Sequence, residues 1–241
     1  MLTFPHTFAP VGPTIPLSYL DDNFNSVANT VVTNIAALRA LSSSGSAGYA
    51  FVLGYYAAGD GGGGPYWYNA ADTTSADNGG TIIVATDGGR WYLQSTGIVS
   101  VKQFGAYGTN ATPDTAAIKA ANTWCNANNK RLWFPSGTYW YVPSGTAPVD
   151  IDNWWGEDAS STIINVDAAT GSFAYPAFRH SGQNELNNIT FQEKSSSTAY
   201  PSVMVQAGPG GCQLSMADHG DYRRWPVCLP GIHRHLGRAI L

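Results

Sequence analysis

The sequence predicts a mainly β protein. Charged residues make up only 12% of the 241 positions, whereas the chain holds 27 glycines, 14 prolines, 8 tryptophans and 13 tyrosines. Glycine and proline favour turns, and aromatic residues favour the half-buried surface of a pleated sheet. From residue 48 onwards, short apolar runs alternate with Gly, Asn, Asp and Ser, which is typical of many short strands joined by turns.

Residues 1–41 are expected to form an extended arm followed by a short helix. Four prolines in the first 20 residues disfavour helix there, and the apolar side chains between them suit an anchor in a groove. From Ser18 to Arg39, apolar residues recur every three or four positions and predict a helix that meets another copy or subunit; an ordinary packed helix in a monomer is the alternative. The candidate anchoring residues are Phe4, Phe8, Ile15, Leu17, Tyr19, Leu20 and Phe24.

Residues 42–47 are small and polar and predict a linker, after which residues 48–98 are expected to form a small β domain. The run of four glycines after Asp60 lacks the lysine and Ser/Thr of a phosphate loop, so it is interpreted as a hairpin loop. Trp67 and Trp91 have rings that could stack on sugars, although packing in the domain core is the more ordinary role.

The stretch from Val101 to Tyr139 predicts a short strand, a glycine turn at 105–108, a helix and two further strands. Thr112 is the expected N-cap, with Pro113 at the first helical position. The helix is expected to turn Ala117, Ile118, Ala121 and Trp124 towards a partner and Lys119 and Asn122 towards water, and to stop at Asn126, Asn128 and Asn129.

This stretch resembles the opening of the pectate-lyase-like right-handed parallel β-helix of bacteriophage tailspikes and capsule depolymerases. The order V..FGA.G....D..AI..A, a strand and then P.G.Y carries the resemblance, which departs from the family at Thr109-Asn110. The matching residues are Val101, Phe104, Gly105, Ala106, Gly108, Asp114, Thr115, Ala117, Ile118, Ala121, Pro135, Gly137 and Tyr139. Two further stretches, 15–24 and 54–93, resemble the N-terminal end and the small domain of phage tail fibres and tailspikes.

The resemblance implies that residues 99–216 begin a parallel β-helix. Three or four coils of about 20–25 residues fit after Leu132. Residues 217–241 break the pattern of strands and turns, and they are interpreted as a tail that is out of frame or disordered.

The function implied is that of a phage tail fibre or tailspike structural protein, located in the virion tail and made in the host cytoplasm. Its expected partners are tail proteins of the adaptor or nozzle type, further copies of itself in a homotrimer, and bacterial surface polysaccharide. The alternative is a polysaccharide depolymerase, either a glycoside hydrolase or a lyase, that is truncated here.

No catalytic residue, cofactor or metal ligand is assigned from the sequence. Glycoside hydrolysis needs two carboxylates, and elimination needs a base with a cation such as Arg179 beside His180, but acidic residues next to Gly and Asn commonly form turns. The carboxylates considered are Asp150, Asp152, Glu157, Asp158, Asp167, Glu185 and Glu193.

Other classes of function find no support in the sequence. Cys125, Cys212 and Cys228 are too widely spaced for a disulfide framework or a zinc site and are expected to be reduced. His233 and His235 have no Cys or acidic neighbour that would complete a metal site. A net charge of -4 argues against nucleic acid as a partner, and no apolar stretch predicts membrane insertion.

Overall fold

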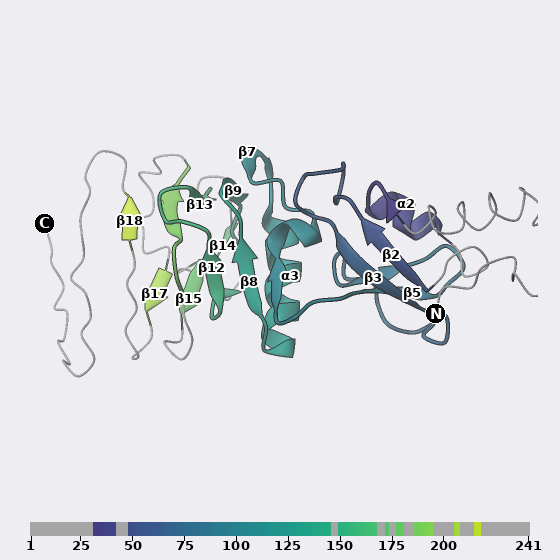
Figure 1. The fold of residues 1–241 in the computed structure, drawn as a ribbon. Coiled ribbons are helices and arrows are strands. Elements are labelled where there is room, and N and C mark those ends of the chain that lie inside the picture. Colours follow the sequence, from purple (N-terminus) through teal and green to yellow (C-terminus); the bar gives the residue numbers. More distant parts are fainter. Residues whose placement is uncertain are drawn as a thin grey trace, which may run out of the picture. The chain divides into compact units, whose positions relative to one another are not determined.

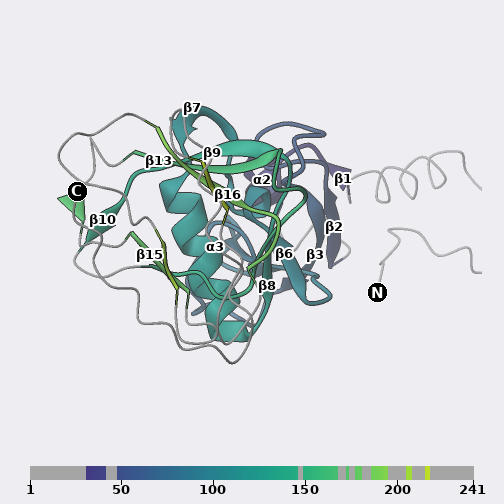
Figure 2. The same cartoon turned by 90° about the vertical axis from the view of Figure 1, so that its left-hand side faces the viewer.

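The computed structural model describes residues 31–41, 48–145, 149–167, 172–173, 177–180, 186–194, 205–207 and 215–217. The chain divides into two compact units (Figures 1 and 2). The first comprises residues 1–108 and 116–135, and the second comprises residues 109–115 and 136–241.

The first unit contains a five-stranded sheet with the strand order β1-β2-β3-β5-β4. Figure 1 labels β2, β3 and β5 of this sheet. β1 runs parallel to β2, and the remaining pairs are antiparallel. Alternate residues of these strands face the core, among them Val52, Tyr66, Ile83 and Trp91, all fully buried. Trp91 therefore belongs to the core. The strands are β1 (Val31–Val32), β2 (Tyr49–Val52), β3 (Gly64–Asn69), β4 (Ile82–Val84) and β5 (Arg90–Leu93).

The helix expected from Ser18 to Arg39 differs in its described part. Val31–Val32 is a strand, and helix α2 spans only Ile35–Ala40. Asn34 ends the extended segment because its side-chain oxygen accepts a hydrogen bond from the Ala37 N–H, which caps the helix. The β-branched valines before it pair with β2, so pairing with the sheet overrides the helical spacing. Residues 18–30 lie outside the described part of the chain.

After the small sheet, the first unit continues through β6 (Ile98–Ser100), the 3-10 helix η1 (Val101–Phe104), helix α3 and β8 (Arg131–Phe134). Ser100 and Gln103 form a capping box at η1, and Gly105 ends it in the left-handed region with φ of 90°. β6 and β8 pair in parallel, as expected for two strands joined by a helix.

Helix α3 spans Thr115–Asn128, so the predicted start at Thr112-Pro113 is wrong. Residues 109–113 instead form strand β7. Asp114 lies between strand and helix, where its backbone N–H donates to the carbonyl of Trp140 at 2.7 Å. Asn122, expected to face water, is buried. The predicted end is confirmed, since the helix stops at Asn128 and Asn129 takes a φ of 51°.

The second unit is a stack of parallel strands that forms the coils of a parallel β-helix. Its five-stranded sheet has the order β18-β16-β13-β9-β7, and Figure 2 shows β9, β13 and β16 side by side. Thr138, Ile163, Thr190 and Ser215 occupy equivalent positions, at intervals of 25, 27 and 25 residues. These strands are β7 (Thr109–Pro113), β9 (Gly137–Tyr141), β13 (Thr162–Val166), β16 (Thr190–Glu193) and β18 (Ser215–Ala217).

Shorter strands form the other sides of each coil. β10 pairs in parallel with β14, and β11, β15 and β17 pair in parallel in that order. These strands are β10 (Ser144–Gly145), β11 (Val149–Asp150), β12 (Trp154–Gly156), β14 (Ser172–Phe173), β15 (Phe178–His180) and β17 (Val205–Ala207).

Aromatic rings fill the interior of the coils. The Phe178 ring lies 4.7 Å from that of Tyr141, 5.6 Å from Trp154 and 5.4 Å from Phe191 between centroids. All four residues are almost fully buried and come from different strands. Contact between the rings of successive coils supplies the core of this unit.

Candidate functional site

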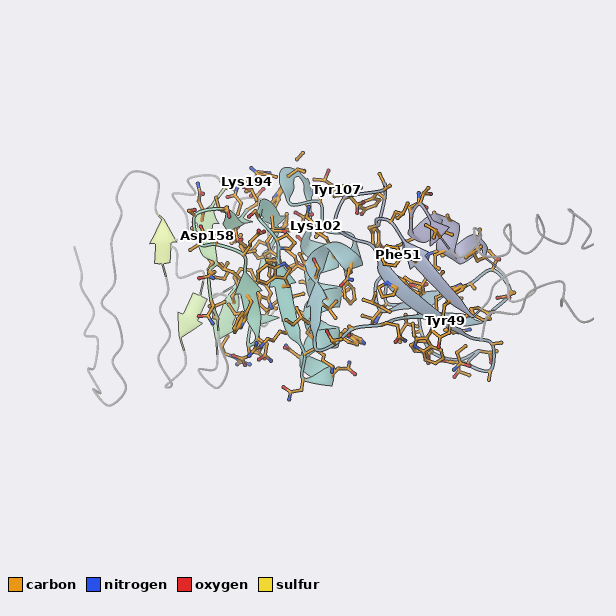
Figure 3. All side chains as sticks on the ribbon, viewed as in Figure 1. Tyr49, Phe51, Lys102, Tyr107, Asp158 and Lys194 are labelled. Carbon is orange, nitrogen blue, oxygen red and sulfur yellow. The ribbon has the colours of Figure 1, made fainter. Side chains whose placement is uncertain are left out.

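The outer side of the small sheet is an exposed apolar surface. Two rows cross it in register: Val31, Phe51 and Pro65, and then Tyr49, Trp67 and Tyr92. Tyr49 is 56% exposed and Phe51 is 50% exposed. Figure 3 labels both side chains on the ribbon. We call these six residues the open face. None of the six is charged, and contiguous exposed apolar residues are characteristic of interaction surfaces.

The rings of the open face stand against one another. The Trp67 and Tyr92 rings stack with centroids 4.9 Å apart and an interplanar angle of 19°. One face of each ring is therefore covered by the other ring and is not open to stacking on a sugar.

A single carboxylate organises the loop between β2 and β3. Asp60 accepts hydrogen bonds from the backbone N–H groups of Tyr55, Tyr56, Ala57 and Gly62, at 2.7–3.0 Å. Partial burial raises the pKa of this carboxyl, but the four N–H donors outweigh burial and hold the pKa below its ordinary value. Asp60 is therefore a structural residue of the loop.

The glycine run of this loop is required by close packing. A Cβ on Gly63 would lie 2.2 Å from the Val52 carbonyl oxygen, and one on Gly62 would lie 2.5 Å from the Lys102 carbonyl oxygen. The run connects two antiparallel strands, so the interpretation as a hairpin loop agrees with the structure.

Tyrosines join this loop to the turn at residues 105–108. The Tyr56 hydroxyl donates to the carbonyl of Gly105 at 2.9 Å. The Tyr56 and Tyr107 rings stack with centroids 4.4 Å apart and an interplanar angle of 3°. The Gln103 amide also donates to the Gly63 carbonyl at 3.0 Å. The predicted glycine turn at residues 105–108 is thus packed onto the loop of the small sheet, within the first unit.

Three of the carboxylates considered from the sequence hold local structure. Asp150 forms a bidentate pair with Arg179, and both side chains are about half exposed. Glu157 accepts from the Ser136 N–H at 2.8 Å. Asp158 accepts from the Ser160 hydroxyl and N–H, and these bonds lower its pKa. The Arg179 guanidinium is therefore already paired with Asp150 of the neighbouring strand.

The other predicted carboxylates differ in burial, and some predicted residues lie outside the described part of the structure. Asp167 is buried and Asp152 is half-buried, whereas Glu185 and the side chain of Glu193 lie outside the described part of the structure. All seven predicted anchoring residues, from Phe4 to Phe24, also lie outside it, as does the segment 218–241.

Cys125 is free and buried, and burial raises the pKa of its thiol to about 12. Within the described ranges, no group of three or more His, Cys, Asp or Glu residues is placed to hold a metal ion. No helix among the same residues has the length and apolar character to span a membrane.

Residues 31–96 match the family model of the phage tail protein small four-stranded beta-sheet domain. The match begins at β1, so it includes α2 together with the sheet. A comparison with curated proteins found no match.

Solved structures similar to this chain are tailspikes and a tailspike-like enzyme. The tailspike gp49 of Acinetobacter baumannii bacteriophage Fri1, a capsular polysaccharide depolymerase, matches with a TM-score of 0.55 and 15% identity, over 78% of this chain and 37% of its own. The tailspike of Acinetobacter phage vB_ApiP_P1 matches with a TM-score of 0.54 and 22% identity, over 77% and 34%. WceF of Pantoea stewartii, a glycan biofilm modifying enzyme, matches with a TM-score of 0.50 and 16% identity, over 78% and 28%.

These similarities show the fold. The chain spans about a third of the length of the solved proteins it matches. Along the chain, the small sheet domain that matches the phage tail family model at residues 31–96 precedes the parallel β-helix coils.

Proposed function

We propose that this protein joins a phage tail through its N-terminal part and presents a β-helix towards the bacterial surface. The observation that carries the proposal is the order of its parts. A phage tail sheet domain at residues 31–96 precedes coils that stack in parallel register. The predicted anchoring residues Phe4 to Phe24 precede both parts, and we assign them to contact with adaptor or nozzle-type tail proteins.

We further propose that the chain assembles as a homotrimer in which neighbouring copies bury the open face. The apolar surface of Tyr49, Phe51 and Trp67 carries no charge that a partner would have to neutralise. A second copy offers the same apolar, uncharged surface, and burial of such surfaces drives association. A separate tail protein on this face is the other outcome of the test given below.

Surface polysaccharide is the proposed target of the β-helix. The support is similarity of fold to gp49, a capsular polysaccharide depolymerase, and to WceF, a glycan biofilm modifying enzyme. We assign no cleavage residues to this chain, because Asp150 is paired with Arg179, and Glu157 and Asp158 accept hydrogen bonds from the backbone N–H groups of Ser136 and Ser160.

The test is to detect the protein in virions. The chain should be found by mass spectrometry in purified particles of the phage that encodes it. A phage whose copy lacks residues 1–30 should assemble particles without this protein. A phage with Thr86→Ala, an exposed position outside residues 1–30, should incorporate the protein normally. Absence of the parent chain from purified particles would overturn the proposed function, and incorporation of the shortened chain would overturn the role of the arm.

A further inference from the structure

The outward side of the β9–β13–β16 sheet carries a row of polar side chains. Trp140, Asn165 and Gln192 are neighbours in parallel register. Residues beside them in the strands, such as Tyr141 and Ile164, are buried in the coil interior, and side chains alternate along a strand. Trp140, Asn165 and Gln192 therefore point away from the interior.

Asn165 is nevertheless only 6% exposed. Its amide nitrogen donates to the Asn110 side-chain oxygen at 3.0 Å. Asn110 has a φ of 59°, in the left-handed region of the backbone map. It lies where the register of β7 shifts between Thr109 and Pro113, and the residue that makes this irregularity also contacts Asn165. An outward-facing side chain of the coil is thus enclosed on the side of β7.

Two polar atoms of this row have no hydrogen-bond partner among the described residues. They are the indole Nε1 of Trp140, a donor, and the Oδ1 of Asn165, an acceptor, and both are buried. Buried polar groups are almost always paired, so an unpaired donor beside an unpaired acceptor requires an explanation. A hydroxyl group answers both needs, because it accepts one hydrogen bond and donates another.

Lys194 lies over this row. Its ammonium nitrogen is 2.7 Å from the centroid of the Trp140 ring, and its backbone N–H donates to the Val166 carbonyl. Figure 3 labels Lys194 in the second unit. The ammonium occupies the ring face on which the C–H face of a sugar would stack. Because a lysine side chain is long and rotatable, it can leave the ring and donate to a ligand oxygen.

We propose that Trp140, Asn165 and Lys194 form a binding subsite for one hexose unit of a glycan. A sugar hydroxyl accepts from Trp140 Nε1 and donates to Asn165 Oδ1, the ring stacks on Trp140, and Lys194 moves aside to contact a sugar oxygen. The subsite deepens the proposed function, on which it rests, by placing glycan contact on the first coils rather than on the small sheet domain.

The test follows the tryptophans directly. The full chain is labelled with 5-fluorotryptophan, and the fluorine resonances of Trp140 and Trp124 are assigned with Trp140→Phe and Trp124→Phe. The chain is then titrated with glucose, galactose, N-acetylglucosamine and glucuronate, and with sorbitol as an acyclic polyol. We expect at least one sugar to shift the Trp140 resonance with half-saturation in the millimolar range, while the Trp124 resonance of helix α3 stays in place.

Variants separate binding from folding. In Asn165→Leu, the acceptor is lost and half-saturation should rise about tenfold or more. In Asn165→Asp, which keeps acceptor oxygens, the sugar should still shift the resonance, so this variant serves if Asn165→Leu fails to fold. In Lys194→Met, any preference for glucuronate over glucose should disappear.

Several results would overturn the subsite. The first is the absence of a shift of the Trp140 resonance with any of the four sugars, which would mean that only a bridging water fills the row. The second is an equal shift with sorbitol. The third is an undiminished shift in Asn165→Leu. These measurements use purified protein. A chain found in virions but silent in the titration overturns the subsite alone, whereas a responding chain absent from virions overturns the tail role alone.

Discussion

Asp60 shows how one side chain determines the backbone of a whole loop. Its two oxygens accept four backbone N–H groups that the hairpin between β2 and β3 would otherwise leave without partners. An aspartate before glycines is expected in a turn, but the sequence does not indicate that its partners lie on both sides of it, from Tyr55 to Gly62.

Replacing Asp60 with Asn should destabilise the protein by about 1–2 kcal/mol, because an amide offers one acceptor oxygen and its nitrogen cannot accept. The pH dependence has a definite sign. The pKa of Asp60 is lowered in the folded state, so its stabilisation is complete above the ordinary aspartate pKa of about 4 and is lost as pH falls through the folded pKa.

We expect the thermal unfolding temperature to fall less in Asp60→Asn than in the parent protein when the pH is lowered from neutral to about pH 2. Thr73→Ala, at an exposed position, is the control and should follow the parent curve. An unchanged acid-side loss in Asp60→Asn would contradict the role given to the carboxylate.

Gly63→Ala should be far more damaging, at more than about 3 kcal/mol, because the new Cβ meets only backbone atoms, which cannot move aside. These atoms are the Val52 oxygen at 2.2 Å, the Leu53 carbonyl carbon at 2.8 Å and the Gly54 nitrogen at 2.9 Å. Gly88→Ala is the matched control, since open space surrounds it and only its φ of 88° opposes the change, at about 1–2 kcal/mol. Urea unfolding of the two variants measures the difference, and equal losses would refute the steric argument.

At the scale of elements, each strand of the second unit is stable only against its neighbours. β15 is three residues long, yet Phe178 within it contacts rings from three other strands. So short a strand cannot persist alone, and the side-chain stack between coils supplies its stability.

Phe178→Ala should therefore cost about 3–5 kcal/mol and cause early unfolding of the coils. Phe178→Leu fills most of the volume and should cost clearly less. Chemical unfolding followed by near-ultraviolet circular dichroism reports the loss of the aromatic stack. A parent-like curve for Phe178→Ala would show that the interior ring contacts contribute little.

The sequence predicted these elements unevenly, for physical reasons. The strands at 131–134, 137–141 and 162–166 hold aromatic and β-branched residues between turn residues, which is a local signal for strands. The start of α3 was misplaced because Thr112-Pro113 is a good local helix signal, and only pairing of β7 with β9 overrides it. Nothing in the local sequence indicates that Asn165 contacts Asn110, which lies 55 positions away.

At the scale of the whole molecule, the open face should decide how the chain associates. Phe51→Lys places a charge at the centre of this half-exposed surface. It should leave the folded chain stable within about 0.5 kcal/mol, because the parent side chain gains little from burial there. The native mass in solution should fall from that of a trimer to that of a monomer.

Thr86→Lys is the matched control, because it adds the same charge at an exposed position outside the open face. Light scattering coupled to size exclusion measures both variants. A trimer that survives Phe51→Lys would assign the open face to a different partner, such as another tail protein.

The length of the second unit is set by its number of coils, as the equivalent positions Thr138, Ile163, Thr190 and Ser215 show. Each further coil of 25 to 27 residues extends the stack by one strand spacing, about 4.8 Å. Inserting a whole coil keeps every inward side chain in its column, whereas inserting half a coil puts outward residues where Phe178 and Phe191 belong. Duplication of whole coils can thus lengthen the stack while the strands before and after the insertion keep their own sequences.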